Sequence, residues 1–338
     1  MALPPRDRAG QTFEIRNLSI AFSTPRGDAR VVDNVSLSIG AGEIVGVIGE
    51  SGSGKTLTAL AALGMLPRGA RIEFGSIVLG GESLLDKTER ERRAIRGDRM
   101  AYIPQDALRS LNPTLRVGVQ VGEPLALHRA TAWNVAKRKA VELLAAVHLR
   151  DPERRAEEYP HQFSGGMQQR AMIAMGLCLE PQLLIADEPT TALDVTVQAQ
   201  VLQLVREIRN EHRTSIFFIT HDLGVVADLC DRVYVMYAGA IVEEGPVDRI
   251  FERPSHPYTR GLLRATPALH GPKEALTPIP GQIPLATERP EGCRFVDRCA
   301  LAIDSCRSPP PWVEIETDHR ALCIRAGEAE MRHEQSAT

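Results

Sequence analysis

The feature that most constrains this sequence is a glycine-rich segment of eight residues between an expected strand and an expected helix. Its residues are Gly49, Glu50, Ser51, Gly52, Ser53, Gly54, Lys55 and Thr56. They match the phosphate-loop pattern, in which backbone N–H groups and the N-terminus of the next helix converge on phosphate oxygens. We expect Lys55 to reach the β- and γ-phosphates and Thr56 to bind Mg²⁺. The flanking strand and helix disfavour the alternative, a glycine-rich turn that merely precedes Lys-Thr.

The strand before this loop and the helix after it follow from local patterns. Residues 13 to 48 are alternating or continuously β-branched around a polar turn, which predicts strands. After Gly54 the residues become small and leucine-rich, which favours a helix that ends near Pro67. Residues from about 106 to 165 are mostly helical in character, and we interpret them as an inserted helical subdomain.

A second run of alternating strands and helices follows this insertion. The expected elements are a helix from about Gly166 to Leu179, the strand LLIAD, the helix VTVQAQVLQLVREIRNEH, the strand SIFFIT and a strand pair in RVYVMYAGAIVEEG. This order predicts an α/β fold with a largely parallel sheet covered on both faces. Beyond about residue 266 the chain is rich in proline and holds four of its six cysteines. We therefore expect a domain over 11–265 and a separate, loop-rich extension over 266–338, whose last dozen residues form a frayed tail.

Length and charge exclude several classes of protein. A chain of 338 residues has room for two domains, or for one large domain with an appendage. A net charge of −3 gives no reason to expect sequence-independent binding to nucleic acid. The longest apolar run, Ala171 to Leu179, is too short to span a bilayer, and the N-terminus lacks the apolar stretch of a secretory signal. We therefore expect a cytoplasmic protein whose cysteines do not form disulfides.

Two acidic residues end a buried apolar strand in the segment LLIADEP, residues 183–189. Carboxylates there need a function, because the strand ends of open α/β sheets face the ligand crevice. We expect Asp187 to hold Mg²⁺, directly or indirectly, and Glu188 to act as the base that orients the attacking water. The alternative is a helix N-cap at Asp187 followed by a turn at Pro189. The phosphate loop favours the first interpretation.

The segment FSGGMQQR, residues 163–170, resembles the signature motif of ATP-binding-cassette (ABC) ATPases. Other motifs of that family occur in order: Gln105 after the strand MAYIPQ, the turn Ala192-Leu193-Asp194, and His221 after SIFFIT. The resemblance covers about residues 11 to 265. The signature departs mildly from the common pattern, with Phe163 where Leu is commonest and Met167 where many cassettes have Gln.

The extension also resembles a known group. The segment HPYTRGLL just before it, and the segments PIPGQIP and GCRFVDRC within it, look like the C-terminal extension of the ATP-binding subunits of bacterial oligopeptide, dipeptide and nickel importers. The resemblance implies a RecA-like phosphate-loop core with a helical subdomain and a Cys- and Pro-rich extension. It also implies an ATPase that powers import of peptides, with nickel or glutathione as alternative cargoes.

In the family that this chain resembles, two cassettes sandwich two ATP molecules head to tail. The resemblance implies that Ser164, Gly165 and Gly166 contact the γ-phosphate held by the partner's phosphate loop. Gln105 would link the Mg²⁺ site to the helical subdomain, and its side chain would also bind Mg²⁺. The remaining assignments are Asp194 at the dimer interface, His221 on the γ-phosphate and Phe22 stacked on adenine. Phe22 fits equally well as a core residue of its strand.

The same resemblance implies partners and a location. We expect a heterodimer with a second cassette subunit, docked on two integral membrane permeases at the cytoplasmic face of the membrane and supplied by an extracytoplasmic substrate-binding protein. A soluble cassette of translation or DNA repair is disfavoured, because the chain has neither a second cassette nor a long coiled coil. A cassette that binds ATP without turnover is disfavoured by the presence of Glu188 and His221.

Four cysteines are concentrated in the extension. They are Cys293, Cys299, Cys306 and Cys323. Thiolates are soft ligands for zinc or iron–sulfur clusters, so these residues are candidate metal ligands. A structural zinc site usually has two cysteines two to four residues apart, and no such pair exists here. Similar cysteine sets in peptide importers are associated with a [4Fe–4S] cluster, which we therefore expect ahead of Zn²⁺ or of four unrelated core thiols. Cys178 and Cys230 are expected core residues.

Overall fold

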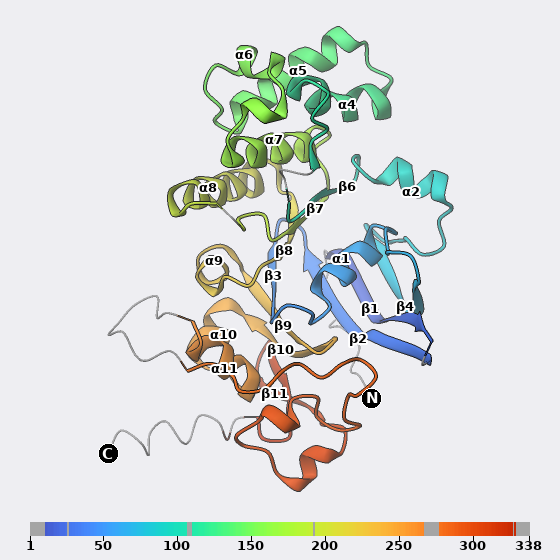
Figure 1. Cartoon of the computed structure of the whole chain (residues 1–338), viewed down its shortest axis with the longest axis vertical. Coiled ribbons are helices and arrows are strands. Elements are labelled where there is room, and N and C mark those ends of the chain that lie inside the picture. Colours follow the sequence, from blue (N-terminus) through green and yellow to red (C-terminus); the bar gives the residue numbers. More distant parts are fainter. Residues whose placement is uncertain are drawn as a thin grey trace. The chain divides into compact units, whose positions relative to one another are not determined.

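The computed structural model describes residues 11–25, 27–106, 110–191, 193–266, 277–326 and 328. The chain divides into two compact units (Figure 1). The first comprises Met1–Ser38, Val45–Leu85 and Ile219–Thr338, and the second comprises Ile39–Ile44 and Asp86–Phe218. The expected boundary between 265 and 266 stays a prediction, and the expected frayed tail lies outside the described residues except for Glu328.

The first unit contains a four-stranded sheet in the order β2-β1-β4-β5. Its strands are β1 (Gln11–Thr24), β2 (Gly27–Gly40), β4 (Ala70–Leu79) and β5 (Glu82–Ser83). The pairs β1–β4 and β4–β5 are antiparallel. The predicted strands at residues 13–22 and 31–39 are confirmed, but β4 was not predicted. The expectation of one largely parallel sheet was therefore incomplete.

The first unit also contributes five strands, in the order β11-β12-β10-β9-β3, to a second sheet. They are β3 (Ile44–Ile48), β9 (Arg232–Tyr237), β10 (Ala240–Pro246), β11 (Trp312–Glu316) and β12 (His319–Leu322). The β3–β9 pair is parallel, and β10 runs antiparallel to β9. All residues of β3 and β9 are buried, as expected for strands covered on both faces. This sheet positions the phosphate loop, which follows β3.

The helices of the first unit are short. They are α1 (Lys55–Ala62), α9 (Leu223–Leu229), α10 (Val247–Glu252), α11 (Pro257–Arg264) and the 3₁₀ turns Val296–Arg298 and Asp304–Arg307. The helix expected after Gly54 is confirmed. Among the residues that the structure describes, no helix of either unit is long and apolar enough to cross a membrane.

The second unit holds three strands, in the order β8-β7-β6, and most of the helical residues (Figure 1). The strands are β6 (Met100–Ile103), β7 (Leu183–Asp187) and β8 (Ser215–Ile219). The helices are α2 (Glu89–Ile95), α4 (Val117–Arg129), α5 (Trp133–Ala146), α6 (Pro152–Glu157), the 3₁₀ turn Pro160–Gln162, α7 (Gly165–Leu177) and α8 (Val195–His212). The predicted helical insertion and the helix over VTVQAQVLQLVREIRNEH are confirmed, whereas α2 was not foreseen.

The extension is joined to the sheet of the first unit. Strand β12 pairs with β10, so the extension prolongs this sheet instead of standing apart as a loop-rich appendage. A buried hydrogen bond of 2.8 Å links His319 Nε2 to Glu243 Oε1, and Arg320 Nε donates to Glu244 Oε1 at 2.9 Å. The sequence pattern predicted a loop-rich extension but not the β11–β12 hairpin, whose partner strand β10 precedes the proline-rich stretch. The bounds of the extension stay a prediction.

Candidate functional site

The phosphate loop is a tight turn whose glycines cannot be replaced freely. Gly49 has a φ of 151°, and a Cβ there would lie 2.1 Å from the carbonyl oxygen of Met236. Gly54 has a φ of 105°, in the left-handed region that favours glycine, and precedes the first residue of α1. The loop therefore leads directly into a helix N-terminus, where backbone N–H groups attract anions.

Lys55 lies inside this loop. Its side chain is buried, and Nζ donates to the carbonyl oxygens of Gly49 at 2.8 Å and Glu50 at 3.0 Å. Ser51, Gly52 and Thr56 are exposed at the loop surface. The amine is thus held over the loop by carbonyl groups, a position from which it can bind a phosphate oxygen. The Thr56 hydroxyl at the start of α1 is a hard oxygen donor of the kind that Mg²⁺ prefers.

In the second unit, the two acidic residues at the end of β7, Asp187 and Glu188, have different environments. Asp187 is 1% exposed and accepts a hydrogen bond of 3.1 Å from Tyr102 Oη. Burial and the neighbouring Asp187 charge raise the pKa of Tyr102 above its ordinary range, so the phenol keeps its proton. Asp187 is therefore oriented as a carboxylate oxygen donor, which suits Mg²⁺. Sequence reasoning missed Tyr102, because one aromatic residue in a strand carries no sign of this role.

Glu188 is held by two neutral donors. Its Oε2 accepts from Gln105 Nε2 at 2.9 Å and from Thr191 Oγ1 at 3.0 Å. Glu188 also has a φ of 48°, which is unusual for a residue with a Cβ and is often found at functional sites. The structure therefore brings together Gln105 and Glu188, two residues that the sequence placed in one site. Thr191 was not foreseen.

The signature residues lie at the start of α7. Ser164 is exposed and caps the helix, its Oγ accepting from Met167 N–H at 3.4 Å. A Cβ at Gly165 would meet nothing within 4 Å, whereas one at Gly166 would lie 2.4 Å from Val197 Cγ1 of α8. One glycine leaves open space at a helix N-terminus, and the other allows two helices to approach closely.

Three further predicted residues occupy loops or strands. Asp194 is exposed and caps α8, accepting from Val197 N–H at 2.9 Å. Ala192 of the same turn lies outside the described residues. His221 is exposed between β8 and α9 of the first unit. Phe22 lies half-buried on β1, opposite Ala70 of β4. Their predicted contacts with nucleotide or with a partner cassette stay predictions.

The four extension cysteines line one small cavity together with His256, Phe295 and Arg325. All four are free thiols, and burial raises the pKa of Cys323 to about 12. Within the described ranges, no three His, Cys, Asp or Glu side chains are arranged so that they could hold a metal ion. The donor type thus suits a soft metal, but the thiols would have to converge further to bind one. Cys178 and Cys230 are buried, as expected for core residues.

Two family matches agree with the two resemblances found in the sequence. Residues 32–191 match the ABC transporter family, and residues 242–306 match the family described as oligopeptide/dipeptide transporter, C-terminal region. The second match includes the segments HPYTRGLL and GCRFVDRC that suggested the same resemblance.

Individual proteins match over nearly the whole chain. A probable peptide ABC transporter ATP-binding protein, y4tR, of Sinorhizobium fredii is 45% identical over 97% of this chain and 99% of its own length. The oligopeptide transport ATP-binding protein OppD of Escherichia coli is 44% identical, covering 95% of each chain.

A solved structure of the ATP-binding cassette MJ0796, a dimer in a post-hydrolysis state with ADP and Pi, is also similar. It is 27% identical, with a TM-score of 0.62 over 70% of this chain and 98% of that one. The fold, the motifs and these relatives lead to one conclusion: the chain belongs to the ABC transporter ATPases, in the group that carries the oligopeptide/dipeptide transporter C-terminal region.

Proposed function

We propose that this chain hydrolyses ATP to power the import of peptides through a membrane transporter. The observation that carries the proposal is the presence, in one chain, of a phosphate loop braced at a helix N-terminus and a C-terminal region that matches the oligopeptide/dipeptide transporter family. The relatives named for peptide or oligopeptide transport, at about 45% identity over most of the chain, support the same cargo.

In the proposed mechanism the phosphate loop binds the β- and γ-phosphates, with Lys55 as the charged contact and the loop N–H groups as the cradle. Glu188 orients a water that attacks the γ-phosphorus and accepts its proton as the bond to the ADP oxygen breaks, giving ADP and phosphate. Gln105 and Thr191 keep its carboxylate in one orientation. His221 contacts the γ-phosphate, and Phe22 stacks on adenine.

Three oxygen donors of this chain suit the magnesium ion that accompanies ATP. They are the Thr56 hydroxyl, the Asp187 carboxylate and the amide oxygen of Gln105. When bound, Mg²⁺ offsets the negative charge of the phosphates. The Tyr102 hydrogen bond holds Asp187 ready for this role without removing its charge.

The exposed start of α7 supports a second part of the proposal. Ser164, Gly165 and Gly166 contact the γ-phosphate of ATP held by a partner cassette, and Asp194 lies at the same interface. We infer a heterodimer with a related cassette, docked at the cytoplasmic face of the membrane on two permeases that receive cargo from an extracytoplasmic binding protein. An active transporter that contains two copies of this chain and no second cassette would contradict the heterodimer.

Transport itself is the direct test. The chain is coexpressed with its permeases and second cassette, reconstituted into liposomes, and assayed for uptake of radiolabelled peptides of two to five residues, Ni²⁺ and glutathione. We expect ATP-dependent peptide uptake that is lost in a transporter with Glu188→Gln. Uptake of Ni²⁺ or glutathione without uptake of peptides would show that the cargo is one of these and not a peptide. ATP turnover by a chain that never copurifies with membrane subunits would overturn the transport role.

The extension cysteines carry a further part of the proposal, an iron–sulfur cluster with Zn²⁺ as the alternative. Four buried or half-buried thiols around one cavity support it, since thiolates are the usual ligands of both. Such a group would cross-link the short elements of the extension and contribute to their folding. Anaerobic purification followed by iron, sulfide and zinc analysis tests this. Serine at all four positions should abolish the bound metal, whereas Cys178→Ala should not. A metal-free wild-type protein would contradict the proposal.

A further inference from the structure

The C-terminal region of the chain contacts the phosphate loop directly, at Glu50. The backbone N–H of Glu50 donates to Tyr258 Oη of α11 at 2.8 Å, and Glu50 Oε2 pairs with Arg298 NH1 of the extension at 3.0 Å. All three residues belong to the first unit. A loop that the sequence presents as self-contained is therefore held from outside by residues more than two hundred positions away.

Arg298 is fixed before it reaches Glu50. Its side chain is 7% exposed, and Nε donates to the carbonyl oxygen of Pro280 at 2.8 Å. The guanidinium also lies over the rings of Tyr237 and Phe295, at 5.7 and 5.9 Å from their centroids. Such a guanidinium loses little conformational entropy when it pairs with a carboxylate. The Arg298–Glu50 pair therefore stabilises the loop more than an exposed ion pair would.

Tyr258 is equally constrained. Its ring is fully buried and packs against Tyr237 and Phe295, with centroid distances of 4.5 and 5.4 Å. Burial raises the pKa of Tyr258, so the hydroxyl stays neutral and can accept from the Glu50 N–H. Three aromatic rings, from β9, α11 and the extension, thus set the position of one hydrogen-bond acceptor beside the phosphate loop.

A second route joins the extension to the loop through the β9–β10 turn. Gly239 N–H donates to the carbonyl oxygen of Ser53 at 2.9 Å, and its own carbonyl accepts from Asp33 N–H at 2.8 Å. Arg294 of the extension donates to the carbonyl oxygen of Ala238 at 2.7 Å and forms an ion pair with Asp33. Gly239 has a φ of 81°, and a Cβ would lie 2.0 Å from the carbonyl oxygen of Val31, so this turn cannot move independently.

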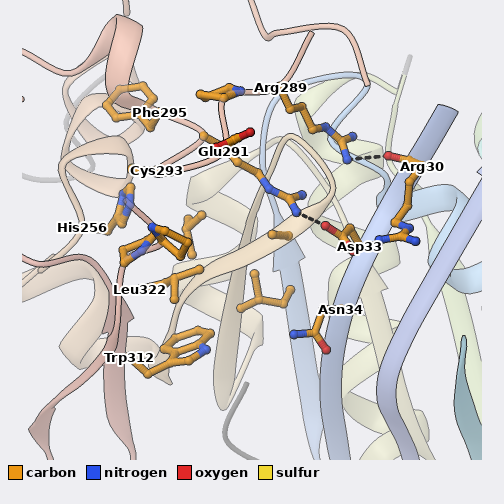
Figure 2. Close-up of a pocket in the computed structure, with 18 of the residues that line it drawn as sticks. Arg30, Asp33, Asn34, His256, Arg289, Glu291, Cys293, Phe295, Trp312 and Leu322 are labelled. Carbon is orange, nitrogen blue, oxygen red and sulfur yellow. Dashed lines mark hydrogen bonds and ion pairs between the residues drawn. The ribbon is translucent and has the colours of Figure 1, made fainter. Parts of the chain in front are cut away.

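Figure 2 shows the cavity beside this contact. Arg289 of the extension points toward the strand that carries Arg30 and Asp33, and its guanidinium donates to the carbonyl oxygens of Arg30 at 2.5 Å and Val31 at 2.8 Å. Phe295 lies on the opposite side of the same cavity, on the segment that carries Cys293. The extension therefore holds both β2 and the turn that supports Ser53.

The contacts at Glu50 extend to the phosphate-binding amine. Glu50 offers its N–H to Tyr258 and its carbonyl oxygen to Lys55 Nζ, so one peptide segment lies between the brace and the amine. Glu50 Oε1 is buried and accepts from no group in the described part of the chain. Loss of Arg298 would leave that carboxylate half-buried without its charge partner, and the loop would have to shift to rehydrate it.

We propose that Arg298 and Tyr258 are positioning residues for the phosphate loop, so that the C-terminal region sets the affinity of this chain for ATP through Glu50. The inference rests on the proposed role of residues 49–56 as the ATP phosphate loop. It assigns to the extension a part in nucleotide binding that is independent of whether its cysteines hold a metal.

The test compares Arg298→Ala with a matched arginine of the same region. Arg253 NH1 forms an ion pair with Glu316 of β11 at 2.8 Å and is the control, because this pair also ties the extension down but does not touch the phosphate loop. ATP affinity is measured by equilibrium binding to the purified full chain, and kcat and KM in the assembled transporter. For Arg298→Ala we expect the Kd and KM for ATP to rise about tenfold with kcat within about twofold, and for Arg253→Ala no change.

Three milder variants keep the test decisive if Arg298→Ala folds poorly. Arg298→Lys retains the charge but not the planar fork, so about half of the loss on a logarithmic scale should return. Tyr258→Phe removes only the acceptor for the Glu50 N–H and should raise the Kd about threefold. Glu50→Gln should weaken binding, and its combination with Arg298→Ala should cost no more than either change alone.

The outcomes separate this inference from the proposed function. If the wild-type chain does not bind ATP, the proposed function fails. If the wild type binds ATP and all of these variants bind it equally well, the positioning role is wrong. Additive effects of the Glu50 and Arg298 changes would also overturn it, because they would mean that the two side chains act separately.

Discussion

The phosphate loop and the signature segment are both glycine-containing turns that begin a helix, but the rest of the chain supports them very differently. In the phosphate loop Ser53 and Lys55 are buried, and the backbone is tied to Tyr258 and Gly239. The signature has an exposed Ser164, and a side chain at Gly165 would project into open space. The rest of the chain holds the first turn in place, while the second turn is exposed at its cap and open at Gly165, as the proposed contact with a partner cassette requires.

The largest expected effect comes from a change that stops ATP hydrolysis but leaves ATP binding at the phosphate loop intact. Glu188→Gln should lower ATP hydrolysis by the assembled transporter about 10²- to 10⁴-fold, because an amide cannot accept the proton of the attacking water. Binding of ATP should remain, and a closed cassette dimer should accumulate. Steady-state hydrolysis and size-exclusion chromatography with ATP measure the two effects. Glu211→Gln, at an exposed position of α8, is the control. Equal hydrolysis by the Glu188 variant and the wild type would contradict the assigned role.

A change inside the phosphate loop should weaken the binding of ATP itself. Lys55→Ala removes the charged contact to phosphate, and we expect ATP affinity to fall about 10- to 100-fold, as for loss of a charge-assisted hydrogen bond. Equilibrium dialysis with labelled ATP measures it. Lys137→Ala changes an exposed lysine of α5 that pairs with Glu157 and should leave affinity unchanged. Retained affinity in the Lys55 variant would mean that the backbone cradle binds ATP without the amine.

The signature segment allows a comparison between adjacent residues. Gly166→Ala places a methyl group against Val197 of α8, so we expect the free energy of unfolding to fall by about 1–3 kcal/mol. Gly165→Ala meets no neighbour, and its free energy of unfolding should change by less than about 0.5 kcal/mol. It should nevertheless slow hydrolysis in the assembled transporter, because the methyl occupies the surface proposed to meet the partner's γ-phosphate. Normal hydrolysis with Gly165→Ala would show that this surface is not used.

The sequence predicted the elements whose structure depends on neighbouring residues, and it missed those that depend on residues far away in the chain. The strand, loop and helix around Gly49–Thr56 and the long helix α8 are encoded by neighbouring residues, and their positions were predicted correctly. Strand β4 was missed, because its residues are only partly buried and their pairing partners lie in β1. The hairpin of β11 and β12 was missed for a similar reason, since its neighbour β10 precedes the proline-rich stretch.

Site residues that belong to sequence motifs could be predicted, whereas those that reach the site only through the fold could not. Gln105 and Glu188 were assigned to one site from their places in a pattern, and the structure joins them by a hydrogen bond. The Arg298–Glu50 pair spans 248 positions and leaves no periodic trace in the sequence. The segments that contain Tyr258 and Arg298 were recognised only as marks of a family. Their physical role became visible once the fold placed them beside the phosphate loop.

The smallest expected effect tests whether the support of the phosphate loop depends on one neutral histidine. His256 is 1% exposed, and its Nδ1 accepts from Tyr258 N–H at 3.0 Å at the start of α11. Burial lowers the pKa of His256 to about 4, against a smaller opposing effect of Glu243. The unfolded chain takes up this proton below about pH 6.5, whereas the folded chain resists it until about pH 4. This contribution to stability is therefore complete above pH 6.5 and is lost progressively as the pH falls toward 4.

From these values we expect the His256 contribution to fall by about 1 kcal/mol between pH 7.5 and pH 5.5, measured by urea unfolding at each pH. His256→Asn keeps a side-chain acceptor for the Tyr258 N–H but cannot titrate, so its stability should depend less on pH by that amount. His161→Asn, at an exposed position, should keep the wild-type dependence. The signature segment has an exposed serine cap instead, so acid in this range should loosen the phosphate-loop support and leave the start of α7 unchanged. Equal pH dependence in His256→Asn and the wild type would show that the buried imidazole does not carry this effect.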